Sequence, residues 1–280
     1  MKTLWQRLTE AVSRLWPLTE YLVLRTETHA YCAALAFFAL LALYPFSSLL
    51  LSFARHIAHW EVAYAVIADT LREYYPTGEE FLLRNLEVSV ATHGSKLQFH
   101  SIIWIMLGLA GFFVPLETAF NRAWEFPEHR PYWKNQLVGF FLTVACCGLA
   151  LLFVLATAGL HTAISAVVPW GSLAFWLRYA ALKLVALPFS IATIFIFYRF
   201  LPNGPVRSRE VLPAAILAGV IAEVLRWVYL LALPFMQLQK SQGPYYVSIS
   251  FAILAYFESF AVLGGAFLAN ERKSRLQAKD

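Results

Sequence analysis

Six long runs of apolar residues follow one another along the chain, separated by more polar connections. The runs are Ala30–Phe53, Phe99–Phe120, Leu137–Ala158, Phe175–Arg199, Val211–Leu233 and Val247–Ala269. Each is close to the roughly 20 residues that a helix needs to cross the hydrocarbon core of a bilayer. None alternates polar and apolar positions, and a backbone in lipid must satisfy its own hydrogen bonds, so we predict helices. The pattern thus predicts an all-α, polytopic membrane bundle with six transmembrane helices.

The composition agrees with this class and excludes three others. Apolar residues make up 60% of the 280 residues and charged residues 14%, whereas soluble proteins have about 45–50% and about 25%. A disordered chain would be poor in aromatic residues and rich in charge. Three cysteines are too few for a disulfide-stapled secreted domain. They lie inside apolar runs, and we interpret them as small buried hydrophobic residues.

Basic residues are distributed unevenly between the two sides of this predicted bundle. Fourteen Lys and Arg residues fall in the terminal segments and in the second and fourth connections, and five fall in the remaining connections. Because cytoplasmic connections of membrane proteins carry an excess of Lys and Arg, we expect both termini in the cytoplasm. Cytoplasmic termini require an even number of spans, which six satisfies.

We divide the chain into residues 1–28, a six-helix transmembrane domain at 29–270 and a basic cytoplasmic tail at 271–280. In residues 1–28, leucines recur at helical spacing and two tryptophans suit the headgroup level, which predicts an amphipathic helix on the cytoplasmic interface. A helix packed on the protein's own connections is the alternative. Residues 54–98 form a long outer connection, where we expect two short amphipathic helices that cap the outer mouth of the bundle.

Several ionisable residues lie deep within the predicted spans. Lys183 is in the fourth span, Glu223 and Arg226 are in the fifth, and Glu258 is in the sixth. A charge at the bilayer centre costs about 2.5–3.5 kcal/mol, so such groups pair with one another or face a watery cavity. Glu223 and Arg226 are three residues apart and share a helix face. Two interpretations remain open: a neutral ion-pair network that holds helices together, or a polar seam that lines a solute pathway.

Aromatic residues share the spans that carry these charges, Tyr229 in the fifth and Tyr256 in the sixth. Aromatic faces attract organic cations by roughly 0.5–2 kcal/mol each. Prolines such as Pro188 and Pro213 favour kinks, and broken helices are common where transporters bind substrate. We therefore predict a substrate pathway whose lining consists of Lys183, Glu223, Arg226, Tyr229, Tyr256 and Glu258.

Motifs for catalysis or metal binding are missing from the sequence. The seven histidines form no HExxH pattern, only Asp69 and Asp280 are aspartates, and neither a P-loop nor GxGxxG occurs. His56 and His59 stand three residues apart, where two interfacial histidines are a simpler interpretation than a metal pair. We expect no enzymatic activity, no cofactor, no bound metal and no nucleic-acid partner.

Five stretches match a known pattern in order and spacing. They are Ala33–Phe38 with Tyr44-Pro45, Glu117–Trp124, Glu128–Trp133, Tyr198–Asn203, and Leu212–Ala215 followed by Glu223 and Tyr229. With them the chain resembles the YihY/BrkB family of bacterial inner-membrane proteins over roughly residues 20–270. The family commonly ends its last span with Leu-Gly-Ala-Glu, whereas Leu263-Gly264-Gly265-Ala266 is followed here by Phe267.

The resemblance implies six helices with both ends inside and a location in the bacterial inner membrane. Its members are associated with envelope functions, solute export and serum resistance, and an older ribonuclease label also attaches to the family. The matched stretches lie at the inner ends of the second and fourth spans, where we place a cytoplasmic mouth formed by Glu117, Asn121, Arg122, Arg130, Arg199 and Asn203.

Together these features favour a channel or secondary transporter that exports a small polar, zwitterionic or cationic solute. A lipid-handling or envelope-assembly protein is the first alternative, and a scaffold without transport is the second. We expect membrane lipids and the solute as partners, and leave open whether the chain forms a homo-oligomer. Buried charge continuous with water favours transport, whereas a lateral opening to lipid favours lipid handling.

Overall fold

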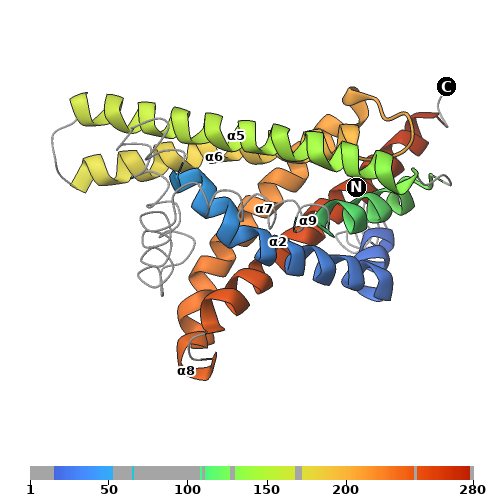
Figure 1. Ribbon diagram of the computed structural model, residues 1–280, viewed down its shortest axis with the longest axis horizontal. Coiled ribbons are helices and arrows are strands. Elements are labelled where there is room, and N and C mark those ends of the chain that lie inside the picture. Colours follow the sequence, from blue (N-terminus) through green and yellow to red (C-terminus); the bar gives the residue numbers. More distant parts are fainter. Residues whose placement is uncertain are drawn as a thin grey trace, which may run out of the picture.

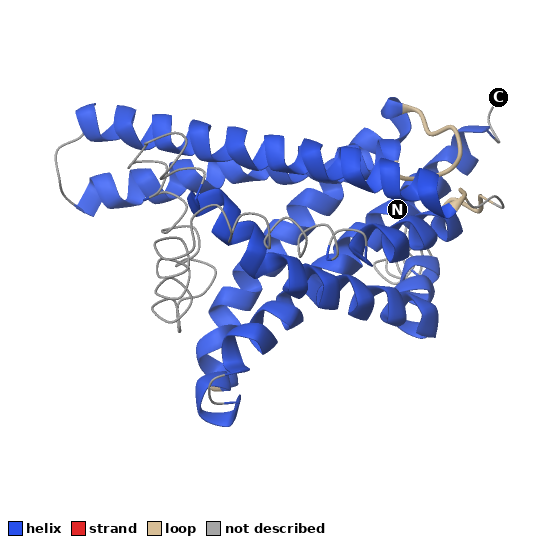
Figure 2. Cartoon of the chain, viewed as in Figure 1, coloured by secondary structure: helices blue, strands red, loops and turns tan. Residues whose placement is uncertain are grey.

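The computed structural model describes residues 16–52, 65, 108, 111–126, 130–167, 172–242 and 245–277. Every regular element within these ranges is a helix, as the sequence predicts (Figures 1 and 2). In chain order these are η1 (Glu20–Leu24), α2 (Thr26–Ser52), α5 (Tyr132–Val167), α6 (Ser172–Phe200), α7 (Ser208–Met236), α8 (Leu238–Gln242) and α9 (Tyr246–Gln277). Residues 111–123 add a further helical segment between α2 and α5.

Four of these helices contain stretches that are long and apolar enough to cross a membrane: Thr26–Leu43, Trp133–Leu160, Ser208–Met236 and Tyr246–Arg272. In α6, Val185–Phe200 is a shorter apolar stretch. Residues 99–107, 109 and 110 of the predicted second span lie outside the described residues. The helices continue beyond the predicted spans, and α9 extends to Gln277. Hydropathy locates the lipid-crossing part of a helix and not the polar turns that extend it into the headgroup region.

The helices pack in the order α5, α6, α7, α9 and α2, each against the next. Segment 111–123 joins the two ends of this row. Its Gly111 lies against the ring of Phe38 in α2, and its Phe113 packs on Gly139 of α5 and on Phe197 of α6. In Figure 1 the α5–α6 pair and the α7–α9 pair meet near the two chain ends and diverge away from them.

The core is concentrated at the end of the bundle where the helices converge. Rings of Phe120, Trp124 and Tyr198 meet edge to face, with centroids 5.3–5.7 Å apart. Gly265 of α9 completes this region, because a Cβ there would lie 2.3 Å from the Tyr198 hydroxyl and 2.8 Å from Cβ of Ala218. The glycine therefore allows α6, α7 and α9 to approach closely, as small residues do in membrane bundles.

The described part of the N-terminal segment packs on the inner end of α9. Tyr21 is buried and stacks on Phe267 with ring centroids 4.6 Å apart, and its carbonyl accepts a 2.7 Å hydrogen bond from Thr28. Burial raises the pKa of Tyr21 to about 12, so this phenol is neutral at physiological pH. Trp16 is exposed. Residues 1–15, the outer connection 54–98 and tail residues 278–280 lie outside the described residues.

Candidate functional site

A three-residue ion cluster, Glu223, Arg226 and Glu258, links α7 to α9. Arg226 donates from Nη1 to Oε2 of Glu223 at 2.6 Å, and from Nε and Nη2 to Oε1 of Glu258 at 3.1 and 2.9 Å. The side chains are 14% exposed for Arg226, 12% for Glu223 and 28% for Glu258. The structure thus brings together three of the four predicted mid-membrane ions. We call these three residues the ion triad.

The fourth predicted ion, Lys183, lies in α6, and its side chain is outside the described residues. Within the triad, two carboxylates face one guanidinium, which leaves one negative charge. Oε1 of Glu223 is buried and has no hydrogen-bond partner among the described residues. A buried acceptor without a partner is unfavourable by about 1–3 kcal/mol.

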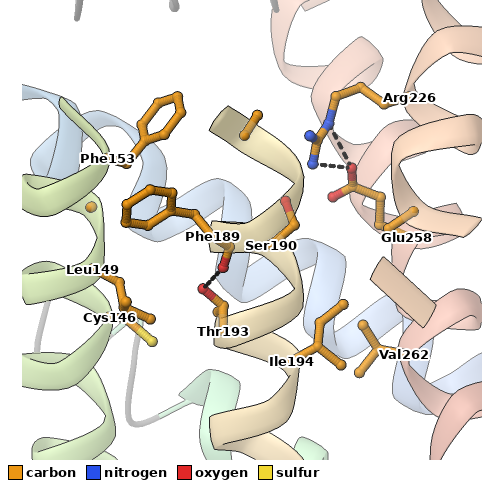
Figure 3. A pocket seen from close by; sticks show the side chains of 13 residues that line it. Cys146, Leu149, Phe153, Phe189, Ser190, Thr193, Ile194, Arg226, Glu258 and Val262 are labelled. Atoms are coloured by element: carbon orange, nitrogen blue, oxygen red, sulfur yellow. Dashed lines mark hydrogen bonds and ion pairs between the residues drawn. The ribbon is translucent and has the colours of Figure 1, made fainter. Parts of the chain in front are cut away.

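A cavity of ≈ 360 Å³ lies beside the triad (Figure 3). Its lining comes from four helices and includes Arg226 and Glu258, but not Glu223. The other lining residues are Cys146, Leu149, Ala150 and Phe153 of α5, Ala186, Phe189, Ser190, Thr193 and Ile194 of α6, Ala222 of α7, and Val262 of α9.

The cavity has two chemically different sides. On the α5 side it is walled by Leu149, Phe153 and Phe189, and the two phenyl rings meet edge to face with centroids 5.6 Å apart. Figure 3 places Arg226 and Glu258 on the opposite side of α6 from these rings. The arrangement suits a small molecule with one charged end and one apolar end.

The two tyrosines predicted for the pathway do not line this cavity. The Tyr229 hydroxyl contacts the Ser250 hydroxyl between α7 and α9. The Tyr256 hydroxyl forms a 2.7 Å hydrogen bond with Nδ1 of His29 in α2, and Nε2 of His29 lies 3.0 Å from the Val23 carbonyl. Both tyrosines therefore join helices through contacts outside this cavity.

Two side chains of the predicted cytoplasmic mouth, those of Asn121 and Arg130, bind backbone atoms, and a third mouth residue, Asn203, supplies one of these atoms. Oδ1 of buried Asn121 accepts a 2.9 Å hydrogen bond from the backbone N–H of Asn203. Arg130 donates to the carbonyls of Leu201 at 3.1 Å and Pro202 at 2.8 Å. These carbonyls follow the last residue of α6, where a helix leaves acceptors unsatisfied. Asn121 and Arg130 thus fix the connection between α6 and α7.

The other three mouth residues are dispersed around this connection. Glu117 is buried at 4% exposure. Arg122 is exposed and pairs with Glu27 at the start of α2. The guanidinium of Arg199 lies over the ring of Phe200, 5.6 Å from its centroid. In this structure the described contacts of these residues are packing and capping contacts, and the cytoplasmic mouth stays a prediction.

The sequence analysis did not identify Cys146, Phe153, Phe189 or Ser190 as cavity residues. Only Ser190 and Thr193 carried a usable signal, because hydroxyl residues at this spacing share the face of α6 that also includes the position of Lys183. The α5 residues carried none, since an apolar side chain that faces a cavity has the same hydropathy as one that faces lipid.

Comparison with known proteins identifies the family. The family model described as Virulence factor BrkB matches residues 23–280. UPF0761 membrane proteins from Xanthomonas campestris pv. campestris (strain B100) and Xanthomonas axonopodis pv. citri (strain 306) are each 27% identical over 163 residues, which is 55% of this chain and 36% of each relative. The match thus spans about a third of the length of these curated relatives. No solved structure matches this chain. Because the family model covers nearly the whole chain, and four of its helices are long and apolar enough to cross a membrane, the chain is a membrane protein that belongs to the Virulence factor BrkB family.

Proposed function

We propose that this protein is a channel or secondary transporter that exports a small cationic or zwitterionic solute, and that the solute binds in the cavity between α5, α6, α7 and α9. One observation carries the proposal: a cavity within apolar helices is lined by Arg226 and Glu258 of the ion triad, whose three charges sum to one negative charge. Charges kept at such depth mark solute and ion pathways in many membrane proteins.

The size and lining of the cavity support a small solute. Its volume of ≈ 360 Å³ lies at the lower end of the roughly 300–1,000 Å³ that small-molecule sites occupy. Glu258 offers a carboxylate at one side, and Ser190 offers a hydroxyl from α6. The apolar α5 side can accommodate the hydrocarbon part of the solute.

The proposal includes six spans with both termini in the cytoplasm of the inner membrane, and a surface helix within residues 1–28. Figure 1 supports this topology, because the start of α2, the α6–α7 connection and the end of α9 lie at the same end of the molecule. The test is thiol labelling in a cysteine-free background. Lys240→Cys in α8 should react with an impermeant reagent added to intact cells, and Arg207→Cys should react only after permeabilisation. The reverse pattern rejects the topology.

Lipid handling is the second candidate function, and one observation favours it. The α5 side of the cavity is apolar, with Leu149, Phe153 and Phe189, and would accommodate an acyl chain. In this alternative the triad would bind a headgroup and the apolar side would bind an acyl chain.

Reconstitution into liposomes separates the two candidates. The purified protein should carry a panel of permanently charged small solutes, such as quaternary amines and betaines, across the bilayer faster than empty liposomes do. The variant Glu258→Gln should remove this flux. If wild-type liposomes move no solute but translocate fluorescent phospholipids between leaflets, transport of small solutes is rejected and lipid handling is supported.

A further inference from the structure

We propose that the solute's cationic group binds Glu258 in place of the Arg226 guanidinium. When a solute binds at Glu258, Arg226 transfers from Glu258 to Glu223, and the site thereby selects amphiphilic solutes that carry a single positive charge. This inference rests on the proposed function and narrows its solute class.

The two carboxylates of the triad differ in their access to the cavity. Glu258 lines the cavity, whereas Glu223 does not. Both N–H groups that Arg226 directs at Glu258 converge on a single oxygen, Oε1. Figure 3 shows this contact at the edge of the cavity, where an entering cation would meet Glu258 beside the guanidinium.

Glu223 has the spare acceptor that a transfer requires. Its Oε2 accepts one hydrogen bond from Arg226, and its Oε1 is buried with no partner among the described residues. A guanidinium binds a carboxylate most strongly through two parallel N–H···O bonds. Because Glu223 and Arg226 are three residues apart on α7, a rotation of the arginine side chain suffices to form both bonds, and neither helix has to move.

The charge count sets the selectivity. The three side chains of the triad sum to one negative charge, so a monocation at Glu258 makes the site neutral. A zwitterion would bring a second carboxylate with no described cation left for it, and a dication would leave one positive charge uncompensated. An unpaired charge is strongly unfavourable in a cavity surrounded by apolar helices. The apolar side formed by Leu149, Phe153 and Phe189 completes the match to an amphiphilic monocation.

A matched series of probes tests this selectivity. The three probes share a trimethylammonium group on a five-carbon chain and differ at the other end: pentyltrimethylammonium ends in a methyl group, 5-trimethylammoniopentanoate in a carboxylate, and pentamethonium in a second trimethylammonium. We expect the wild-type protein in detergent to bind the first about tenfold or more tightly than the other two, since a tenfold difference requires only about one uncompensated polar interaction.

Glu223→Gln is the decisive variant. A site in which Glu258 alone binds the cation would lose in this variant only the longer-range attraction of the Glu223 charge, because Glu223 does not touch the cavity. Under our proposal the variant leaves a neutral Arg226–Glu258 pair with no second carboxylate to receive the arginine, so affinity for pentyltrimethylammonium should fall about tenfold or more. Glu223→Asp should restore most of it. Thr193→Val is the matched control, since this residue lines the cavity but its hydroxyl donates to the Phe189 carbonyl at 2.9 Å.

Thermal unfolding of each variant, followed in the same detergent, establishes that it is folded before binding is compared. The proposal is supported if the wild-type protein binds the monocation more tightly than both other probes, and if this affinity is lost in Glu223→Gln and returns in Glu223→Asp. Equal binding of the zwitterion, or full affinity in Glu223→Gln, overturns it while solute transport stands. A switch of preference to pentamethonium in Lys183→Met overturns the charge count. If no probe binds the protein and no probe crosses the liposome bilayer, both the proposed function and this inference are overturned.

Discussion

The end of the bundle where the helices converge, which the proposed topology makes the inner end, and the middle of the bundle both contain charged and polar side chains. These side chains have different kinds of partners. At the inner end, Asn121 and Arg130 bind backbone atoms of the α6–α7 connection. In the middle, Arg226 binds the side chains of Glu223 and Glu258, and two of these three residues face a cavity.

The partners determine what each region can do. A side chain that binds backbone carbonyls can release them only if the connection itself rearranges, so Asn121 and Arg130 contribute to the fold. A side chain that binds another side chain can exchange that partner for a ligand while the backbone stays in place. The comparison therefore assigns stability to the inner end and, under the proposed function, solute recognition to the middle. Four substitutions test this assignment, from the largest expected effect on stability to the smallest.

Arg226→Ala should lower the free energy of unfolding by about 3 kcal/mol, because removal of one partner leaves two acidic side chains unpaired within apolar helices. Chemical denaturation in detergent micelles measures this change. Arg209→Ala, at an exposed position in the first turn of α7, is the matched control and should change stability by less than about 0.5 kcal/mol. Equal stability of the two variants would mean that the triad contributes nothing to the link between α7 and α9.

Arg130→Ala should destabilise the protein by about 2 kcal/mol, since it removes two charge-assisted hydrogen bonds from buried carbonyls. Arg130→Lys should recover only part of this loss, because an ammonium cannot reproduce the fork of the guanidinium. Solute flux per folded molecule should stay at the wild-type level in both. A loss of flux with unchanged thermal stability would instead place Arg130 on the solute pathway.

Gly265→Ala should destabilise by about 1–3 kcal/mol, because the added methyl group would overlap the Tyr198 hydroxyl and Ala218. Gly148→Ala in α5 provides the control: nothing lies within 4 Å of its Cβ position, and alanine is favoured over glycine inside a helix by about 1 kcal/mol. The two variants should thus shift the thermal midpoint in opposite directions. A shift in the same direction would show that α6, α7 and α9 do not pack through Gly265.

Arg122→Ala should have the smallest effect, about 0–1 kcal/mol, because its pairing with Glu27 is exposed to solvent on both sides. The difference between variant and wild type should shrink further as salt is added, since exposed pairs are screened. A cost well above this range, unchanged by salt, would extend the stabilising role of the inner end to its surface.

The helices were predictable from sequence because hydropathy measures the transfer of a side chain into lipid. The predicted span Val211–Leu233 lies within α7, Ser208–Met236, and Val247–Ala269 lies within α9. The pairing of Glu223 with Arg226 was predictable for a similar reason, since a spacing of three fixes a shared helix face. The contact of Glu258 with this pair was predictable because an unpaired charge deep in a membrane span is unfavourable.

Contacts between helices were not predictable from one sequence. Tyr256 pairs with His29, 227 residues away, and neither residue type indicates the other. Asn121 and Arg130 have the composition of a polar mouth, and only their partners show that they cap backbone groups. The apolar side of the cavity escaped prediction because Phe153 and Leu149 give the same hydropathy signal whether they face lipid, protein or an empty volume.

The attachment of α9 has a mechanical consequence. Within one turn of Glu258, the carbonyl of Val262 accepts a 2.5 Å hydrogen bond from Tyr198 of α6, and Gly265 then packs against the same tyrosine. The inner half of α6 is thereby fastened to α9, whereas α5 packs mainly on α6. Pro188 interrupts the hydrogen-bond ladder of α6 beside the cavity.

We therefore expect α9 to stay in place while α5 and the half of α6 before Pro188 rotate together about a hinge at Pro188. Spin labels at Leu155 in α5 and Leu231 in α7, both on exposed faces, would report this motion as a change in their separation when pentyltrimethylammonium is added. An unchanged separation would mean that the cavity opens by another route. If this rotation occurs, the cavity opens at the end of the bundle where α5 and α6 diverge from α9.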